Sequence, residues 1–301
     1  MRRRWPGPWR NSPRGNGVLA VAETNPLLLR VVTGAVLVAV ALAAVWLGGM
    51  AFAALVAAGV LVMFAEWAVM HRLSRLVMRV GLAILAGIIM LAALGRLDEA
   101  MLLLGFGAVI IGLFAASLQS RLPTDALPTG KMDRARGQAA TMGLLYCGLP
   151  ALALIWLRDL PLGLPATVFV LVCVWATDIA AYFAGRTIGG AKLAPSISPN
   201  KTWAGAIGGV VGAMLIGGGL ALAYLASVQG IGALKLIALA GGLAALSVLG
   251  DLFESWLKRR AGVKDSGNIL PGHGGVMDRL DGLVPVAVAG AAVFAVTGWA
   301  G

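Results

Sequence analysis

Nine long apolar segments run through this chain and limit what it can fold into. Each is close to the roughly 20 residues that a helix needs to cross about 30 Å of hydrocarbon. Hydrophobic residues make up 59% of the sequence and charged residues only 12%, which leaves too little polar surface to cover a water-soluble protein. We therefore predict an all-α, polytopic integral membrane protein with about nine transmembrane helices. The expected spans lie near residues 31–48, 50–70, 76–94, 99–118, 139–157, 164–184, 203–226, 231–250 and 283–299.

The distribution of basic residues predicts the orientation of the chain. A net charge of +11 would suggest a nucleic-acid partner for a soluble protein, but in membrane proteins Lys and Arg gather on the cytoplasmic side. If the N-terminus is cytoplasmic, 21 of the 24 Lys and Arg residues lie before the first span or in the segments 71–79, 119–138, 185–202 and 251–282. We therefore predict a cytoplasmic N-terminus, a location in the cell (inner) membrane, and no nucleic-acid partner.

The chain is expected to divide into three parts. Residues 1–26 are rich in Arg, Pro and Gly and lack a long apolar core, which predicts a basic, disordered cytoplasmic tail rather than a cleavable signal peptide. Residues 27–138 carry the N-terminal transmembrane helices. Residues 139–301 form a C-terminal transmembrane region with cytoplasmic loops at 185–202 and 251–282.

Small residues predict close helix contacts. Gly208 and Gly212 are four residues apart and share one face of the seventh span, as close approach of two membrane helices requires. Such glycine-lined faces could pack within one chain or form a homodimer. Cys147 and Cys173 lie in apolar runs without metal-binding or disulfide spacing, so we interpret them as reduced packing residues.

The segment from Gly250 to Gly282 holds five of the thirteen acidic residues of the chain. If the eighth helix continues past Gly250, then Asp251, Ser255 and Lys258 share one face, and Glu254 flanks it. Asp278 and Asp281 lie one helical turn apart. A carboxylate within the membrane costs about 2.5–3.5 kcal/mol on insertion scales, so one that persists usually has a partner or a task.

Carboxylates offered by two helix ends suit a hard cation such as Mg²⁺, which prefers oxygen ligands and is often shared with substrate phosphates. Asp251, Asp278 and Asp281 are therefore candidate metal ligands. The alternative is that these acids form ion pairs with Lys258, Arg259 and Arg279.

The run Pro271-Gly272-His273-Gly274-Gly275 predicts a flexible turn whose backbone amides can approach an anion closely. The nearby side chains of Lys258, Arg259, Lys264 and Asp265 strengthen this to a phosphate-binding hypothesis. His273 could donate a proton or hydrogen bond to a phosphate, or could serve only a local hydrogen bond. His71 follows the second span in a basic loop and gives a much weaker signal.

A second polar cluster lies upstream. Asp178 interrupts the sixth span, and Tyr182 and Arg186 continue the same helix face. The run Ser198-Pro199-Asn200-Lys201-Thr202 directly precedes the seventh span, where hydroxyls, an amide and an ammonium would suit phosphate oxygens. The alternative is that this run only caps the N-terminus of the helix and that Lys201 only helps to set the orientation of the chain in the membrane.

At these residues the chain resembles the CDP-diacylglycerol synthases, also called phosphatidate cytidylyltransferases. The signature of that family is a serine, a Lys-Arg pair, a Lys-Asp pair, Pro-Gly-His-Gly-Gly and two aspartates three residues apart. This sequence matches it at Ser255, Lys258, Arg259, Lys264, Asp265, Pro271, Gly272, His273, Gly274, Gly275, Asp278 and Asp281. The resemblance extends to the region from Asp178 to Gly205, whereas residues 1 to about 135 match only in being apolar.

The resemblance implies transfer of CMP from CTP to phosphatidic acid, which gives CDP-diacylglycerol and pyrophosphate for phospholipid biosynthesis. It also implies Mg²⁺, with room for a second cation, and makes residues 139–301 the catalytic region. The implied catalytic residues are Asp251, Lys258, Arg259, Lys264, Asp265, His273, Asp278 and Asp281, of which Asp251, Asp278 and Asp281 would bind metal. The implied substrate-binding residues are Asp178, Tyr182, Arg186, Ser198, Asn200, Lys201, Thr202, Ser255, Gly272, Gly274, Gly275 and Arg279.

Two other classes of function compete with this one. A kinase of a lipid alcohol such as a polyprenol would use the same metal and phosphate chemistry but would release a nucleoside diphosphate. A secondary transporter could use Asp178, Glu66 and Asp251 as coupling carboxylates. The acids cluster near one membrane face and no paired halves with broken helices are visible, which disfavours a transporter.

Overall fold

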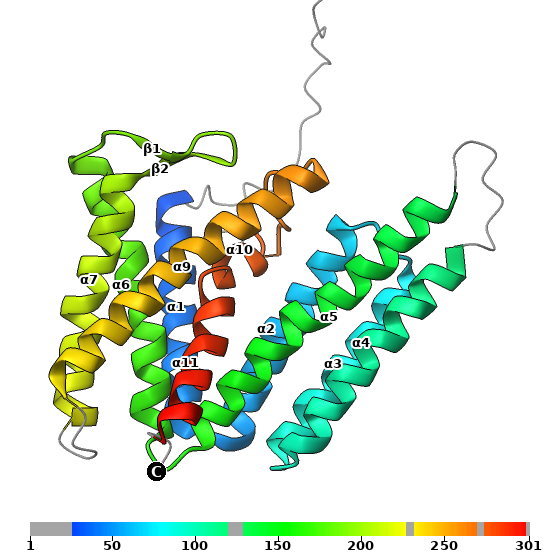
Figure 1. Cartoon of the computed structure of the whole chain (residues 1–301), viewed down its shortest axis with the longest axis horizontal. Coiled ribbons are helices and arrows are strands. Elements are labelled where there is room, and N and C mark those ends of the chain that lie inside the picture. The colour runs from blue at the N-terminus through cyan, green and yellow to red at the C-terminus, as the bar shows by residue number, and fades with distance from the viewer. Residues whose placement is uncertain (1–25, 120–128, 227–231, 270–273, 299–301) are drawn as a thin grey trace, which may run out of the picture.

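The computed structural model describes residues 26–119, 129–226, 232–269 and 274–298. Almost all of them are helical, in a bundle whose long helices run broadly alongside one another (Figure 1). The elements in chain order are α1 (Pro26–Leu47), α2 (Gly49–Met70), α3 (Arg75–Ala93), α4 (Leu97–Gln119), α5 (Thr129–Asp159), α6 (Gly163–Thr187), β1 (Lys192–Ala194), β2 (Ser198–Thr202), α7 (Trp203–Ala221), the π-helical turn η1 (Leu222–Ala226), α9 (Ala233–Ala261), α10 (Met277–Leu280) and α11 (Leu283–Thr297).

The all-α membrane class is confirmed. Within the described ranges, seven helices are long and apolar enough to cross a bilayer, namely α2 to α7 and α9. Two shorter apolar helical stretches, Gly34–Leu47 of α1 and Leu283–Thr297 of α11, fall within the first and last predicted spans. The number of nine spans and the cytoplasmic N-terminus stay predictions, and the predicted tail lies outside the described residues apart from Pro26.

Three elements depart from the sequence-based boundaries. Helix α5 begins at Thr129, about a third of its length before the predicted start at residue 139. Helix α9 continues past Gly250 to Ala261, so the first part of the predicted loop 251–282 is helical. The predicted loop 185–202 contains a short antiparallel hairpin, in which Lys192 pairs with Thr202 and Ala194 with Ser198.

The residues at the C-terminus of α9 explain why the helix ends there. Lys258, Arg259 and Arg260 occupy its last turn, where positive charge interacts favourably with the helix dipole. Gly262 then adopts the left-handed conformation with φ of 76°, and its N–H donates to the carbonyl of Arg259 at 3.1 Å. Glycine adopts this conformation without steric strain, so it ends the helix and turns the chain toward α10.

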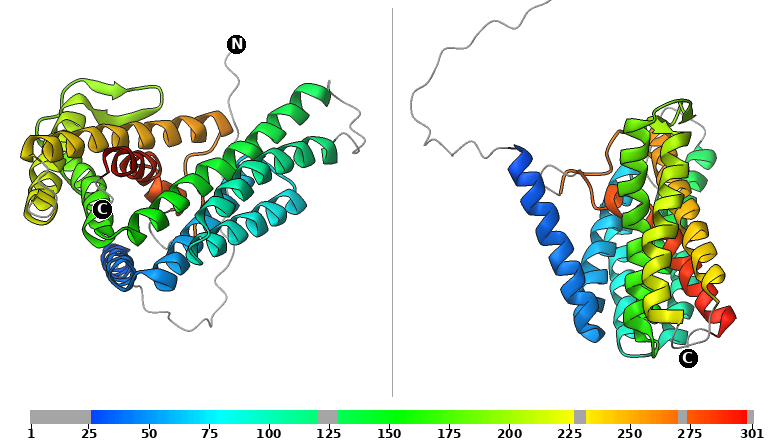
Figure 2. Two further views of the ribbon diagram at one scale, coloured as in Figure 1. Left: turned by 60° about the horizontal axis from the view of Figure 1, so that its bottom comes forward. Right: turned by 90° about the vertical axis from the view of Figure 1, so that its left-hand side faces the viewer.

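The helices form two groups that meet along α5. Helices α2 to α5 pack on one side, and α6, α7 and α9 on the other, while α11 lies between α5 and α9 (Figures 1 and 2). A large apolar core fills the first group and a second core joins α5, α6, α9 and α11. The hairpin, the C-terminal end of α9 and the facing ends of α4 and α5 lie at the same end of the bundle (Figure 1).

Helices α6 and α7 approach each other through small residues, as the sequence predicted. A methyl group added at Gly208 would collide with Ala184, and one added at Gly212 would collide with Ala180. The glycine face is therefore used within the chain, since only glycine allows this approach. The predicted homodimer is not tested by this contact and stays a prediction.

We expect Gly212→Val to destabilise the protein, because its side chain would overlap Ala180 of α6. Overpacking of this kind costs about 1–3 kcal/mol, measured as the free energy of unfolding in detergent. The matched control is Gly219→Val on the same helix, where an added Cβ meets nothing within 4 Å. Equal losses for both variants would show that the contact between α6 and α7 is not the cause.

Candidate active site

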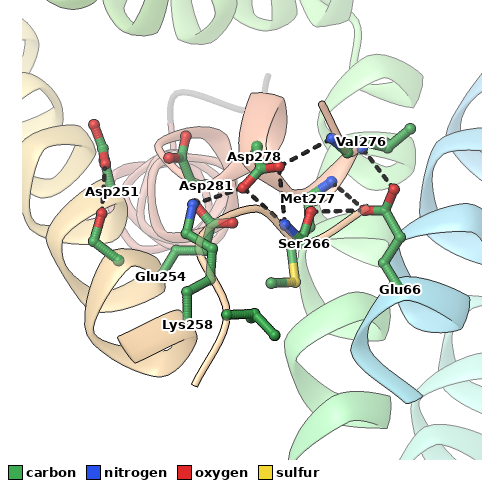
Figure 3. Close-up of polar contacts among 12 residues, drawn as sticks. Glu66, Asp251, Glu254, Lys258, Ser266, Val276, Met277, Asp278 and Asp281 are labelled. Carbon is green, nitrogen blue, oxygen red and sulfur yellow. Dashed lines mark hydrogen bonds and ion pairs between the residues drawn. The ribbon is translucent and has the colours of Figure 1, made fainter. Parts of the chain in front are cut away.

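The charged residues meet at the end of the bundle where α9, the loop after it, α10 and the hairpin come together (Figures 1 and 3). Helix α9 supplies Asp251, Glu254 and Lys258, α10 supplies Asp278, and Asp281 follows directly as the C-cap residue of α10. Residues that are some 20 to 30 positions apart in sequence thus face one another, as the sequence predicted.

Three carboxylates form the centre of the site. One oxygen each from Asp251, Glu254 and Asp281 lies within 4.8 Å of the other two. The side chain of Glu254 is fully buried; its Oε2 forms an ion pair with Lys258 at 3.3 Å, and within the described ranges no hydrogen bond reaches its Oε1. Buried polar atoms are normally satisfied, so this cluster has unused oxygen ligands of the type that a hard divalent cation prefers. The residues present therefore fit a cation such as Mg²⁺.

Two lysines border the acidic cluster from different elements. Lys201 of β2 forms an ion pair with Asp251. Lys258 Nζ lies 2.6 Å from Asp278 Oδ1 and 3.3 Å from Glu254 Oε2. The hydroxyl of Ser255 donates to Asp251 at 3.4 Å. The site thus places ammonium groups beside carboxylates, which suits the phosphates of a metal-bound substrate.

Asp278 is held differently from the three clustered carboxylates. It accepts hydrogen bonds from the backbone N–H groups of Gly275 at 2.9 Å and Ser266 at 3.1 Å, in addition to Lys258. Burial acts to raise the pKa of Asp278, but the bonds from Lys258 and these amides outweigh it and hold the pKa below its usual range. Asp278 is therefore a fixed anion of the site.

Asp281 has the opposite electrostatic environment. Burial, followed by the charge of Asp251, raises the pKa of Asp281, although the N–H of Gly282 donates to its Oδ1 at 2.7 Å. Like charges brought together in a poorly solvated place disfavour ionisation. A cation in the cluster would reverse this effect, because it stabilises the ionised carboxylates.

The structure therefore groups two of the three predicted metal ligands. Asp251 and Asp281 are joined by Glu254, whereas Asp278 is engaged by Lys258, and its role as a ligand stays a prediction. Glu254 was placed only at the flank of the predicted helix face. Its signal was its position three residues after Asp251, because residues three apart are neighbours on a helix surface.

Of the second polar cluster predicted from the sequence, Asp178, Tyr182 and Arg186, only Asp178 lies near the acidic residues of the site. Asp178 lies close enough to Asp251, Lys201 and Arg279 for their charges to act on it. Tyr182 and Arg186 instead contact each other: Arg186 Nη1 donates to the Tyr182 hydroxyl at 2.8 Å, and both side chains are exposed.

The run from Ser198 to Thr202 contains the helix cap considered for it and places its lysine at the acidic cluster, while phosphate binding by this run stays a prediction. Thr202 is a helix N-cap, since its hydroxyl accepts from the N–H of Gly205 at 3.0 Å at the start of α7. Lys201, one residue earlier, reaches Asp251. Ser198 pairs with Ala194 in the hairpin and Asn200 is exposed.

The remaining predicted residues surround the loop between α9 and α10. Arg259 donates from Nε to the carbonyl of Ile197 at 3.3 Å, which ties α9 to the hairpin. Lys264, Asp265 and Arg279 are exposed. Gly274 has φ of 80° and Gly275 is buried. Gly272 and His273 lie outside the described residues.

Fold and site together define a polytopic membrane protein with an acidic, lysine-bordered site at one end of its helices. The model of the cytidylyltransferase family matches residues 28–297 of this chain. A phosphatidate cytidylyltransferase of Brucella suis is 43% identical over 263 residues, which cover 87% of this chain and 90% of the relative. A phosphatidate cytidylyltransferase of Pseudomonas aeruginosa is 38% identical over 276 residues, which cover 90% and 97%.

A further relative, the phosphatidate cytidylyltransferase of Bacillus subtilis, is 42% identical over 142 residues, or 47% of this chain. These matches confirm the resemblance recognised in the sequence. The chain belongs to the cytidylyltransferase family, and it is an enzyme.

We expect Glu254→Gln to raise the Mg²⁺ concentration for half-maximal activity by about tenfold or more, since even groups around a metal ligand change affinity by 10–100-fold. The measurement is enzyme activity as a function of Mg²⁺ at saturating substrates. Glu99→Gln is the control, because Glu99 is exposed and forms a surface ion pair with Arg96. An unchanged Mg²⁺ requirement in Glu254→Gln would remove Glu254 from the set of ligands.

Proposed function

We propose that this enzyme transfers CMP from CTP to phosphatidic acid in a Mg²⁺-dependent reaction that yields CDP-diacylglycerol and pyrophosphate. The observation that carries the proposal is the cluster of Asp251, Glu254 and Asp281 with Lys201 and Lys258 at its border. The names of the relatives, which are phosphatidate cytidylyltransferases, support the choice of substrates.

Asp251, Glu254 and Asp281 are the residues that would hold Mg²⁺. When bound there, the cation would supply charge neutralisation for phosphate oxygens of the nucleotide. The set of ligands predicted from the sequence contained Asp278, and Glu254 takes its place in this proposal. We also propose that the site has room for a second cation and that Asp265 serves as an outer ligand, which Mg²⁺ titration of an Asp265→Asn variant tests.

In the reaction, an anionic phosphate oxygen of phosphatidic acid forms a bond to the α-phosphorus of CTP. The bond from that phosphorus to the oxygen bridging to the β-phosphate breaks, and its electron pair leaves with pyrophosphate. The nucleophile is already ionised, so the protein need not remove a proton. Its task is to align the two phosphates and to neutralise charge.

The two bordering lysines are suited to that task. Lys201 lies against Asp251, and its ammonium can hold a phosphate oxygen beside the cluster. Lys258 is kept in place by Asp278 and Glu254. We assign Arg259 and Lys264, at the exposed end of α9 and just after it, to the departing pyrophosphate.

We also propose that the enzyme lies in the inner membrane with this site facing the cytoplasm, where CTP is made. The support is the distribution of Lys and Arg in the sequence and the position of the hairpin and the end of α9 at the same end of the bundle (Figure 1).

The reaction is tested by pyrophosphate release from detergent-purified protein given CTP, Mg²⁺ and phosphatidic acid, with each component omitted in turn. We expect release only with all three, together with a CDP-lipid product. Release of a nucleoside diphosphate with a phosphorylated lipid would instead identify a kinase. If the folded protein produced neither product, the proposed reaction and the kinase alternative would both be contradicted, and the transporter hypothesis would be tested next.

The orientation is tested by labelling single cysteines in intact cells with a membrane-impermeant thiol reagent. Asn268→Cys, in the exposed loop after α9, should be protected, whereas Arg96→Cys, between α3 and α4, should be labelled. The native Cys147 and Cys173 are buried, which keeps the background low. Labelling of Asn268→Cys from outside with protection of Arg96→Cys would reverse the proposed orientation.

A further inference from the structure

A carboxylate from the N-terminal half of the chain contacts residues of the loop between α9 and α10. Glu66 lies near the end of α2 and is 4% exposed. Its Oε1 accepts the N–H of Val276 at 2.9 Å, and its Oε2 accepts the N–H of Met277 at 2.8 Å and the hydroxyl of Ser266 at 3.1 Å (Figure 3). Within the described ranges Glu66 forms no ion pair, so amides and a hydroxyl are the groups that satisfy it.

The backbone of the loop is shaped around this carboxylate. A methyl group at Gly267 would come within 2.5 Å of Glu66 Oε1, and one at Gly275 would come within 2.8 Å of the same atom. An added methyl at Gly275 would also collide with the hydroxyl of Ser266. Both glycines therefore permit a close approach of backbone to carboxylate. Gly275, which the sequence suggested for phosphate binding, has this packing role in the structure.

The residues that bind Glu66 are shared with, or adjacent to, residues that bind Asp278. Ser266 donates its hydroxyl to Glu66 and its backbone N–H to Asp278 at 3.1 Å. Gly275, whose N–H also binds Asp278, directly precedes the two amides bound by Glu66. Lys258 then bridges Asp278 to Glu254 of the acidic cluster. A continuous set of polar contacts thus runs from α2 to the proposed metal ligands.

We infer that Glu66 is a positioning residue of the active site, which fixes Ser266, Val276 and Met277 so that Asp278, Lys258 and Asp281 keep their places at the acidic cluster. This inference rests on the proposed function for its catalytic consequence. It gives the N-terminal helices a part in the site, although the sequence there showed only apolar character, and Glu66 had been considered only as a coupling group of a transporter.

Glu66→Gln tests the inference, because the amide keeps the shape of the side chain but presents an NH₂ group toward donors. We expect kcat to fall on the order of 10-fold to 100-fold, since small displacements of catalytic groups have effects of this size. We also expect the Mg²⁺ concentration for half-maximal activity to rise. A merely structural role would lower the amount of active enzyme and leave that concentration unchanged. Glu99→Gln is the matched control, with an exposed carboxylate.

Ser266→Ala provides a second variant that removes one of the three hydrogen bonds to Glu66. If both residues act through one loop, the double variant Glu66→Gln/Ser266→Ala will lose less activity than the product of the two single losses. Fully multiplicative losses with an unchanged Mg²⁺ requirement would overturn the inference.

Hydrogen–deuterium exchange separates this inference from the proposed reaction. Peptides that cover residues 274–280 should exchange faster in Glu66→Gln than in wild type, and should be unchanged in Glu99→Gln. Unchanged exchange together with wild-type kinetics would contradict the positioning role. Faster exchange in a protein whose wild type makes no CDP-lipid would instead overturn the reaction while the control of the loop by Glu66 stands.

Discussion

The organisation of the site depends on how a few buried carboxylates are paired and hydrogen-bonded at the end of an apolar helix bundle. Charges removed from water cost several kcal/mol unless they are paired and hydrogen-bonded. Asp278 is compensated by Lys258 and two backbone amides, and Glu66 by two amides and a hydroxyl. The extension of α9, the hairpin that carries Lys201 and the glycine-rich loop all bring compensating groups to these acids.

The clustered carboxylates Asp251, Glu254 and Asp281 are less fully compensated than Asp278 and Glu66, and this is why they indicate a functional site. Glu254 is buried with an ion pair to Lys258 at Oε2 but, among the described residues, no partner at Oε1, and Asp281 lies against the charge of Asp251. Such an arrangement does not stabilise a protein by itself. The apolar cores and the close glycine contact between α6 and α7 supply stability elsewhere. A metal ion and a phosphate substrate would complete the interactions of the cluster.

The sequence predicted the membrane class and the approximate spans because about 20 apolar residues in a row have few other stable environments. It also predicted that Asp251 and Asp281 would face one space, because their spacing places them at two adjoining helix ends. It did not select Glu254 over Asp278 as the third carboxylate of the cluster. Lys258 pairs with both acids, but only Asp278 also accepts the backbone N–H groups of Ser266 and Gly275, and residue spacing does not determine these contacts.

Glu66 was beyond sequence reasoning for a related reason. Its hydrogen-bond partners lie 200 to 211 positions away in the sequence, and two of them are backbone N–H groups, whose partners cannot be predicted from residue type. The hairpin was missed because a run of four polar residues and a proline before a helix predicts a helix cap, and Thr202 is indeed a cap. Only the fold shows that the same run also pairs with Lys192–Ala194 and carries Lys201 to Asp251.

The most direct test of this account is the position of Mn²⁺, used in place of Mg²⁺, found by anomalous diffraction from crystals of the full chain. The account predicts an anomalous peak in contact with carboxylate oxygens of Asp251, Glu254 and Asp281, with Asp278 still bound to Lys258. A peak held by Asp278 without Glu254, or none at this cluster under conditions in which the crystallised enzyme is active, would contradict it.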